Sequence, residues 1–399
     1  MRMARAHGAI AIGLIAAFVP PAAAADSASP VILAGAQAEK PPPSAAAMAE
    51  YRRLLEIYNK AHDAYAAAAT AYWSSIGDKR RARFAKRAGN EQVVLDDYVL
   101  TQQPVYAGPP KPVDPSAPKP ETPPKAAVPV VADFLSAVLN EFNFRPRQPQ
   151  SDIEFKRAYA HVAAAAGLSI DQAVRIYAFE ATGNGTYDIQ AGLEYDRPGA
   201  HAITTALGYN QLLATNSVEI IAEKGDQFSK SLEAKAKRLP DGDSRALQAT
   251  IAVVRKMIAF SRSVSDDWNQ HQTLAGTAKG QAIHAMNLDL DVGPLLQTQK
   301  LMDSVVFARR KGYRAVLTAA ELEMMNLTGD GNGFDMIVMP PEWRSQVPTA
   351  NFFQRRGYAD NPVAQRNNVV AGLIAATDAV MDRESKKQGA RDLAAAFSN

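Results

Sequence analysis

Glu180 is the residue whose type and position point most directly to chemistry. It continues an apolar stripe in which Ala173, Ile176 and Tyr177 recur at helical spacing, so the helix that carries it should bury this face. Burial disfavours the charged form of a carboxyl group, and the negative end of the helix dipole acts in the same direction. We therefore expect Glu180 to stay protonated near neutral pH, which is what a general acid needs.

The helix that must position Glu180 begins with a cap. Ser169 and Gln172 have the spacing of a capping box, which predicts a helix that starts directly after Ser169. The chain then continues with Gly183-Asn184-Gly185, whose glycines permit a sharp turn. Glu180 should therefore stand at the end of a helix, next to a loop.

Polar residues alternate with apolar ones after this turn, in Thr186 to Gly192, which predicts a short strand or hairpin. Alternation places Thr186, Asp188 and Gln190 on one face, where they would suit the hydroxyl and amide groups of a sugar chain. Asp188 is the nearest second carboxylate in the sequence, and we expect it to act as a catalytic partner that positions the reacting groups. Gln190 is a candidate substrate-binding residue. The alternative is that this segment is an ordinary polar loop, which would have the same sequence pattern.

A second motif is the run Ala206-Leu207-Gly208-Tyr209-Asn210-Gln211-Leu212, which comes shortly before another helix start. Together with the helix that ends in Glu180, it resembles the lysozyme superfamily, most closely the lytic transglycosylases and related peptidoglycan-cleaving muramidases. The resemblance covers roughly residues 176–219. It implies that Glu180 is the acid and that Gly208, Tyr209 and Gln211 belong to the segment that contacts the glycan. Ala181-Thr182-Gly183 stands where the family usually has a serine, so hydrolysis and transglycosylation both remain open.

Aromatic residues gather again further along the chain, on loop-like sequence. Trp343 and Tyr358 lie among prolines, arginines and amides, and we expect them to bind sugar rings on the opposite side of the site. Packing of these aromatics against the core is the alternative. The glycine-rich run from Asp330 lacks the glycine and glutamate positions of an EF-hand, so we expect neither a metal ion nor any other cofactor.

Composition limits the classes of protein that fit. The chain has no cysteine, which excludes thiol nucleophiles, zinc–thiolate sites and disulfides. Residues 1–25 have the basic, apolar and small-residue regions of a signal peptide, which predicts export to the periplasm. The formal charge of +3 is nearly balanced, and export makes nucleic acid an improbable partner.

The remaining sequence predicts four parts between the signal peptide and the C-terminal residues. We expect a flexible lead-in at 26–46, a coiled-coil-like helical segment at 47–101, a proline-rich linker at 102–130 and a helical domain at 131–385. Residues 386–399 are expected to form a C-terminal tail. Helical spacing of apolar residues within 47–76 allows self-association or contact with an envelope protein.

These features predict a mainly α protein with a lysozyme-like helical domain and at most a small β-hairpin. The function that they favour is cleavage of peptidoglycan glycan strands by an exported enzyme. A non-catalytic wall-binding or scaffold protein on the same fold is the first alternative, because fold alone does not establish activity. A glycosidase that acts on another amino-sugar polymer is the second.

Overall fold

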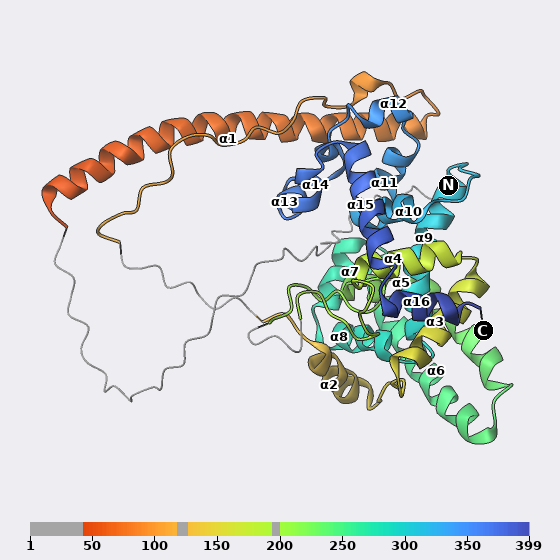
Figure 1. Ribbon diagram of the computed structural model, residues 1–399. Helices are drawn as coiled ribbons and strands as arrows, with labels where there is room; N and C mark the ends of the chain where they lie inside the picture. The colour runs from red at the N-terminus through yellow and green to blue at the C-terminus, as the bar shows by residue number, and fades with distance from the viewer. Residues whose placement is uncertain (1–42, 118–126, 194–199, 399) are drawn as a thin grey trace, which may run out of the picture. The chain divides into compact units, whose positions relative to one another are not determined.

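The computed structural model describes residues 43–117, 127–193 and 200–398, and this part of the chain is mainly helical (Figure 1). The predicted signal peptide and most of the predicted lead-in lie outside the described residues. The chain divides into an N-terminal unit, Ile15–Ala126, and a C-terminal unit that contains Ala127–Asn399. Among the described residues there is no β-strand, and the predicted hairpin is replaced by isolated bridges such as Gln190–Leu207 and Leu207–Leu212.

Most helices follow one another along the chain with short connections, and the long ones lie between η1 and α2 and between α4 and α5. In order they are α1 Ala45–Ala88, η1 Leu95–Asp97, α2 Val131–Phe142, α3 Asp152–Ala166, α4 Ile170–Glu180, α5 Ala214–Ala236, α6 Asp241–Ser261, α7 Trp268–Ala275, α8 Ala278–His284, η2 Ala285–Leu288, α9 Gly293–Arg310, α10 Ala319–Thr328, α11 Asp330–Ile337, α12 Pro341–Arg344, η3 Thr349–Phe352, α13 Arg355–Ala359, α14 Pro362–Arg366, α15 Val370–Glu384 and α16 Gln388–Ala396.

In the N-terminal unit, the aromatic stripe of α1 contacts an extended segment of the same unit. The Tyr106 ring lies 6.1 Å from Tyr58, 5.9 Å from His62 and 5.5 Å from Tyr65, measured between ring centroids. Further along α1, Lys86 Nζ lies 2.7 Å from a carboxylate oxygen of Asp97. The chain after α1 therefore runs back along the helix, and part of the predicted self-association face already has an intramolecular partner.

The C-terminal unit has two hydrophobic cores. One is built mainly by α2, α5, α6 and α8, and Figure 1 shows α5 and α6 side by side as a hairpin. The other is built mainly by α3, α4, α10, α11 and α16. Helix α9 contributes to both, with Leu296 in the first core and Leu301 in the second. The segment after Leu207 does the same, because Leu207 and Leu212 belong to the first core and Tyr209 to the second.

The predicted C-terminal tail is instead a packed helix, α16. Ala390 and Leu393 are fully buried in the second core. Their spacing of three residues places both on one helical face, and burial of this face stabilises the helix. The backbone N–H of Ala390 donates to the carbonyl of Gly183, at 2.9 Å, in the loop that follows Glu180. The end of the described chain therefore supports the surroundings of Glu180.

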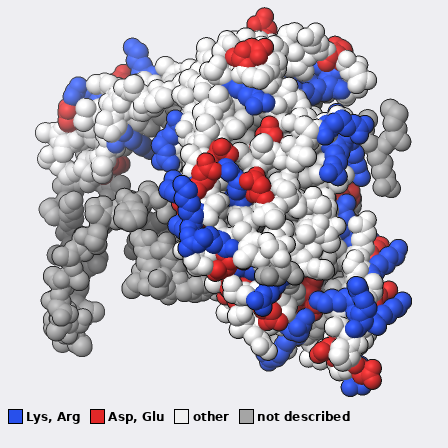
Figure 2. Space-filling view, turned by 45° about the vertical axis from the view of Figure 1, so that its right-hand side comes forward, with Lys and Arg blue, Asp and Glu red and all other residues white. Residues whose placement is uncertain are grey.

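The charged surface is mixed in sign. Lysine and arginine side chains alternate with aspartate and glutamate over the face shown in Figure 2. This agrees with the nearly balanced formal charge of +3. In the described part of the chain, none of the helices combines the length and the apolar character that a membrane span requires.

Candidate functional site

Helix α4 presents Glu180 as the sequence predicts. The capping box is confirmed: Ser169 Oγ accepts from the N–H of Gln172 at 3.1 Å, and Gln172 Oε1 accepts from the N–H of Ser169 at 3.0 Å. Ile176 and Tyr177 are fully buried, so this stripe faces the second core. Glu180 is the last residue of the helix and is half-buried.

Two polar residues of α10 lie against Glu180. Asn326 Nδ2 donates to Glu180 Oε1 at 2.6 Å, and it lies 3.3 Å from each carboxylate oxygen of Glu323. Glu323 is only 1% exposed, so its carboxyl group contacts these protein partners instead of water. One amide therefore bridges two carboxyl groups from helices α4 and α10.

The two carboxyl groups, bridged by Asn326, also influence each other's protonation. Burial raises the pKa of Glu323 well above its ordinary value, and the nearby Glu180 charge raises it further. Burial also raises the pKa of Glu180, although the Lys300 charge and hydrogen bonds from Glu323 and Asn326 oppose this effect. Because like charges in one buried site disfavour double ionisation, the pair binds a proton more tightly than two exposed glutamates would.

Lys300 of α9 supplies a cation that acts on both carboxyl groups. Burial lowers the pKa of Lys300, while the charges of Glu180 and Glu323 favour its protonated form. Its ammonium group donates to the carbonyl of Asn210 at 2.7 Å and to that of Gln211 at 3.1 Å. Lys300 therefore binds the Gly208–Gln211 segment, the second motif of the sequence, while its charge acts on the carboxyl pair.

The Gly208–Gln211 segment forms a tight loop. Leu207 and Leu212 close it by exchanging two backbone hydrogen bonds, of 2.9 and 3.0 Å. Gly208 has φ +81°, and a Cβ atom at this position would lie 2.4 Å from Gln297 Nε2. Gln297 in turn accepts from the N–H of Asn210 at 2.8 Å. Glycine is therefore required both by the backbone conformation and by the close approach of Gln297.

Asp152, the first residue of α3, joins this loop to the loop after Glu180. Its Oδ1 accepts from the Tyr209 hydroxyl and from the N–H of Tyr187, each at 2.8 Å. Its Oδ2 pairs with Lys156 Nζ at 2.6 Å. Tyr209 is fully buried among aromatic rings, so the predicted substrate contact by its side chain does not fit. A buried ring cannot reach an external polymer, and Tyr209 anchors the loop instead.

Asp188 and Gln190 have local partners. Asp188 is half-buried and accepts from the Thr186 hydroxyl at 2.6 Å. Gln190 is 1% exposed, and its amide donates to the carbonyls of Pro129 and Thr204. The buried Gln190 side chain therefore fastens two loops, which does not fit the predicted contact with substrate. Gln211 remains half-buried, and its amide donates to the Gly208 carbonyl at 2.8 Å.

The two predicted aromatic contacts differ in exposure. Trp343 is half-buried in the short helix α12, so part of its ring is accessible. Tyr358 is 1% exposed, and its hydroxyl lies 3.2 Å from Thr349 Oγ1. The alternative prediction, packing against the core, therefore fits Tyr358. Its predicted contact with a sugar ring does not fit this burial.

Glu323, Asn326 and Lys300 were missed by the sequence analysis. Glu323 and Asn326 stand three residues apart in a run that otherwise reads Leu322, Met324, Met325 and Leu327, and this was the available signal. Polar residues on one face of an apolar helix segment indicate a polar contact inside the protein. Their partner Glu180, however, lies 146 residues from Asn326 in the sequence.

The residues of this site consist of two carboxyl groups, one ammonium group and amides. Among the described residues, no group of three or more histidine, cysteine, aspartate or glutamate side chains is placed to hold a metal ion. The arrangement can bind and release a proton at Glu180, which is the accessible member of the carboxyl pair. Comparison of the chain with protein-family models, with curated proteins and with solved structures gives no match.

Proposed function

We propose that this protein is an exported enzyme that cleaves the β-1,4 glycan strands of peptidoglycan, with Glu180 as general acid and base. The observation that carries the proposal is the position of Glu180. Its half-buried carboxyl group has a raised pKa at the end of α4. The charge of Lys300, whose ammonium group binds the carbonyls of Asn210 and Gln211, acts on Glu180. The Gly208–Gln211 loop resembles the segment that the lysozyme superfamily uses to contact glycan. A lysozyme-like arrangement of the helical C-terminal unit is part of the proposal.

In the proposed reaction Glu180 first donates a proton and later accepts one. Protonated Glu180 gives its proton to the glycosidic oxygen, and the electron pair of the breaking C–O bond goes to that oxygen. The sugar carbon is then attacked by water or by a hydroxyl group of the same sugar, and the proton of the attacking group returns to Glu180. Attack by water gives hydrolysis, and attack by the sugar's own hydroxyl gives a 1,6-anhydro product.

The proposal places the protein in the periplasm, after removal of residues 1–25. The N-terminal unit would hold the enzyme in the envelope through a protein partner or through self-association. Sequencing of the N-terminus of the protein recovered from a periplasmic fraction tests the export, and a start near Asp26 is expected.

Substitution of Glu180 tests the enzymatic activity. In a gel that contains purified cell wall, the wild type should clear the wall, and Glu180→Gln should lose about 10²–10⁴-fold in rate, the range for a lost general acid. Glu141→Gln is the matched control, because Glu141 is exposed on α2. Equal clearing by the wild type and Glu180→Gln would contradict the role of Glu180. Mass spectrometry of the released fragments separates hydrolysis from transglycosylation.

A non-catalytic wall-binding protein is the second candidate, and one observation favours it. Glu180, Glu323, Asn326 and Lys300 all have partners within the protein, as in a structural polar cluster. This candidate predicts that neither the wild type nor Glu180→Gln clears the wall, whereas both sediment with it. Clearing of chitin or chitosan but not of cell wall would instead indicate a glycosidase of another amino-sugar polymer.

A further inference from the structure

We propose that Glu323 is the proton partner of Glu180, so that the two carboxyl groups hold one proton between them. Glu323 is then a positioning residue, which acts on the substrate only through Glu180. This inference deepens the proposed function and rests on it for its role in catalysis. The sequence-based expectation of a single acid is replaced by a pair from α4 and α10.

The geometry holds the two carboxyl groups together. Asn326 Nδ2 contacts Glu180 Oε1 at 2.6 Å and both oxygens of Glu323 at 3.3 Å. Glu323 and Asn326 are one helical turn apart on α10, so their relative position is set by the helix itself. The start of α10 is fixed by a capping box between Thr318 and Glu321. Neither α10 side chain can follow Glu180 into solvent, because both are buried.

The charges of the cluster favour one shared proton. Glu180 and Glu323 are the two acidic groups, and Lys300 is the charged group on α9 that acts on both. With one proton on the carboxyl pair, the cluster contains one carboxylate and one ammonium group and is neutral. Removing the proton leaves a buried negative charge, which is unfavourable away from water. The Lys300 ammonium cannot move freely toward either carboxylate, because the carbonyls of Asn210 and Gln211 also hold it.

A shared proton gives Glu180 both roles that the proposed reaction needs. Buried Glu323 keeps the proton near Glu180 at neutral pH, where an exposed glutamate would have lost it. When Glu180 gives this proton to the leaving oxygen, two carboxylates remain side by side. Their repulsion makes Glu180 a stronger base, which favours the return of a proton from the attacking group.

Infrared spectroscopy tests the shared proton without any measurement of activity. At about pH 7.5 the wild type should show the carbonyl band of a protonated carboxylic acid. A shared proton predicts that Glu180→Gln and Glu323→Gln each lose this band, because the remaining carboxyl group then faces Lys300 alone. Survival of the band in Glu180→Gln would show that Glu323 holds a proton of its own and would overturn the proposal.

Two further variants guard against a folding defect. Lys300→Met removes the cation and should keep the band, because the pair then loses its proton less readily. Glu141→Gln leaves the cluster unchanged and should also keep it. If Glu323→Gln fails to fold, Glu180→Gln and Lys300→Met still decide the question. Loss of the band in Lys300→Met would contradict the shared proton.

The pH profile of wall clearing gives the catalytic part of the test. As pH rises, the activity of Glu323→Gln should start to fall at a lower pH than that of the wild type. Above this pH its activity should decrease roughly tenfold per pH unit. A merely structural role would lower activity equally at all pH values and would overturn the proposal. If no protein clears the wall but the band behaves as expected, the proposed function fails and the proton pair stands.

Discussion

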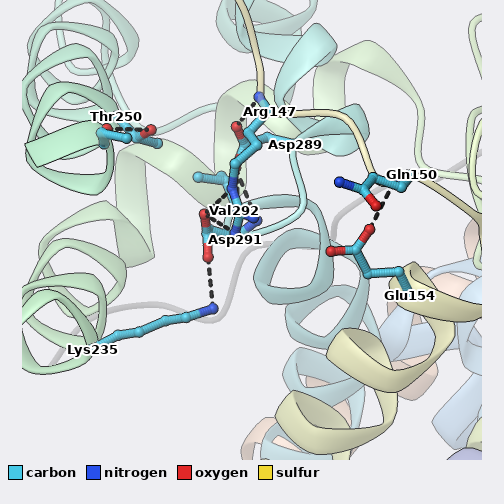
Figure 3. A network of polar contacts seen from close by, with 9 residues as sticks. Arg147, Gln150, Glu154, Lys235, Thr250, Asp289, Asp291 and Val292 are labelled. Carbon is cyan, nitrogen blue, oxygen red and sulfur yellow. Dashed lines mark hydrogen bonds and ion pairs between the residues drawn. The ribbon is translucent and has the colours of Figure 1, made fainter. Parts of the chain in front are cut away.

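Two pairs of acidic residues in the C-terminal unit, each with at least one buried member, differ in how their charges are balanced. The pair Asp289 and Asp291 lies before α9 (Figure 3), and the pair Glu180 and Glu323 lies between α4 and α10. Asp291 contacts two cations, Arg147 at 2.8 Å and Lys235 at 2.6 Å. The cation that acts on both members of the glutamate pair, within the part of the chain that the structure describes, is Lys300.

The donors around the two pairs differ as well. Asp289 accepts from the backbone N–H groups of Arg147, Asp291 and Val292, at 2.8, 2.9 and 3.0 Å. These donors are fixed by the chain itself and tie the segment before α3 to the start of α9. Glu180 and Glu323 are bridged by the amide side chain of Asn326.

Protonation follows from these surroundings. Burial raises the pKa of Asp291, but hydrogen bonds from Lys235 and Arg147 outweigh it and lower the pKa overall. Burial raises the pKa of Asp289 to about 6, with a further contribution from the Asp291 charge. The aspartate pair is fully enclosed, whereas Glu180 is half-buried. A buried acid that exchanges its proton with a ligand must keep one accessible side, and only the glutamate pair does so.

Removing Asp289 should have the largest effect on stability. Asp289→Ala leaves three backbone donors without an acceptor, two of them buried and one partly buried, so the free energy of unfolding should fall by about 3–5 kcal/mol. Glu323→Gln keeps the shape and leaves Glu180 and Lys300 as one anion and one cation, so it should change stability by less than about 1 kcal/mol. Urea unfolding of both variants measures this difference. A larger loss of stability for Glu323→Gln than for Asp289→Ala would contradict the view that the aspartate pair is structural and the glutamate pair belongs to the site.

The next largest effect should be the contribution of Asp289 to the pH dependence of stability. Its pKa is about 6 in the folded protein and 3.8 in the unfolded chain, so the stabilisation that comes from its bound proton is complete below pH 3.8 and is lost as pH rises through 6. The advantage of the wild type over Asp289→Asn should therefore be about 3 kcal/mol larger at low pH than at pH 7.5. Unfolding curves at several pH values measure it. Asp243→Asn, at an exposed site, should show no such trend.

Substitution of two glycines distinguishes the effect of backbone strain alone from the added effect of close packing at the site. Gly167 has φ +93° with open space around it, and Gly208 has φ +81° with Gln297 at 2.4 Å from an added Cβ. Gly167→Ala should cost about 1–2 kcal/mol of stability, and Gly208→Ala about 2–4 kcal/mol. Gly208→Ala alone should also weaken wall clearing, because it displaces the loop carbonyls that bind Lys300. Equal effects on clearing would show that this loop does not support the site.

Asp188 should give the smallest effect. Because it contacts Thr186 in the loop after Glu180, Asp188→Asn should lower wall clearing by less than about tenfold, whereas Glu180→Gln loses a general acid. Steady-state turnover of soluble wall fragments compares the two variants. Activity lost as completely as in Glu180→Gln would make Asp188, rather than Glu323, the second essential carboxyl group.

The sequence by itself determined the local elements of this protein. Helix α4 begins at its capping box and ends at Glu180, as its cap and apolar spacing predict. Caps and helical periodicity depend on residues within one or two turns, so a single sequence contains this information. The C-terminal helix α16 was missed although its apolar spacing is present, because the short segment was read as a chain end.

Only the tertiary structure decided which groups surround Glu180. Asn326 and Glu323 come from α10, and Lys300 comes from α9, each more than 100 residues further along the chain. The same packing buried Tyr209, Gln190 and Tyr358, which the sequence had placed in contact with substrate. The local sequence around a polar residue is the same whether its side chain contacts solvent, a ligand or another buried polar group. Its surroundings are set by how the two cores pack around α9, and no local pattern encodes that arrangement.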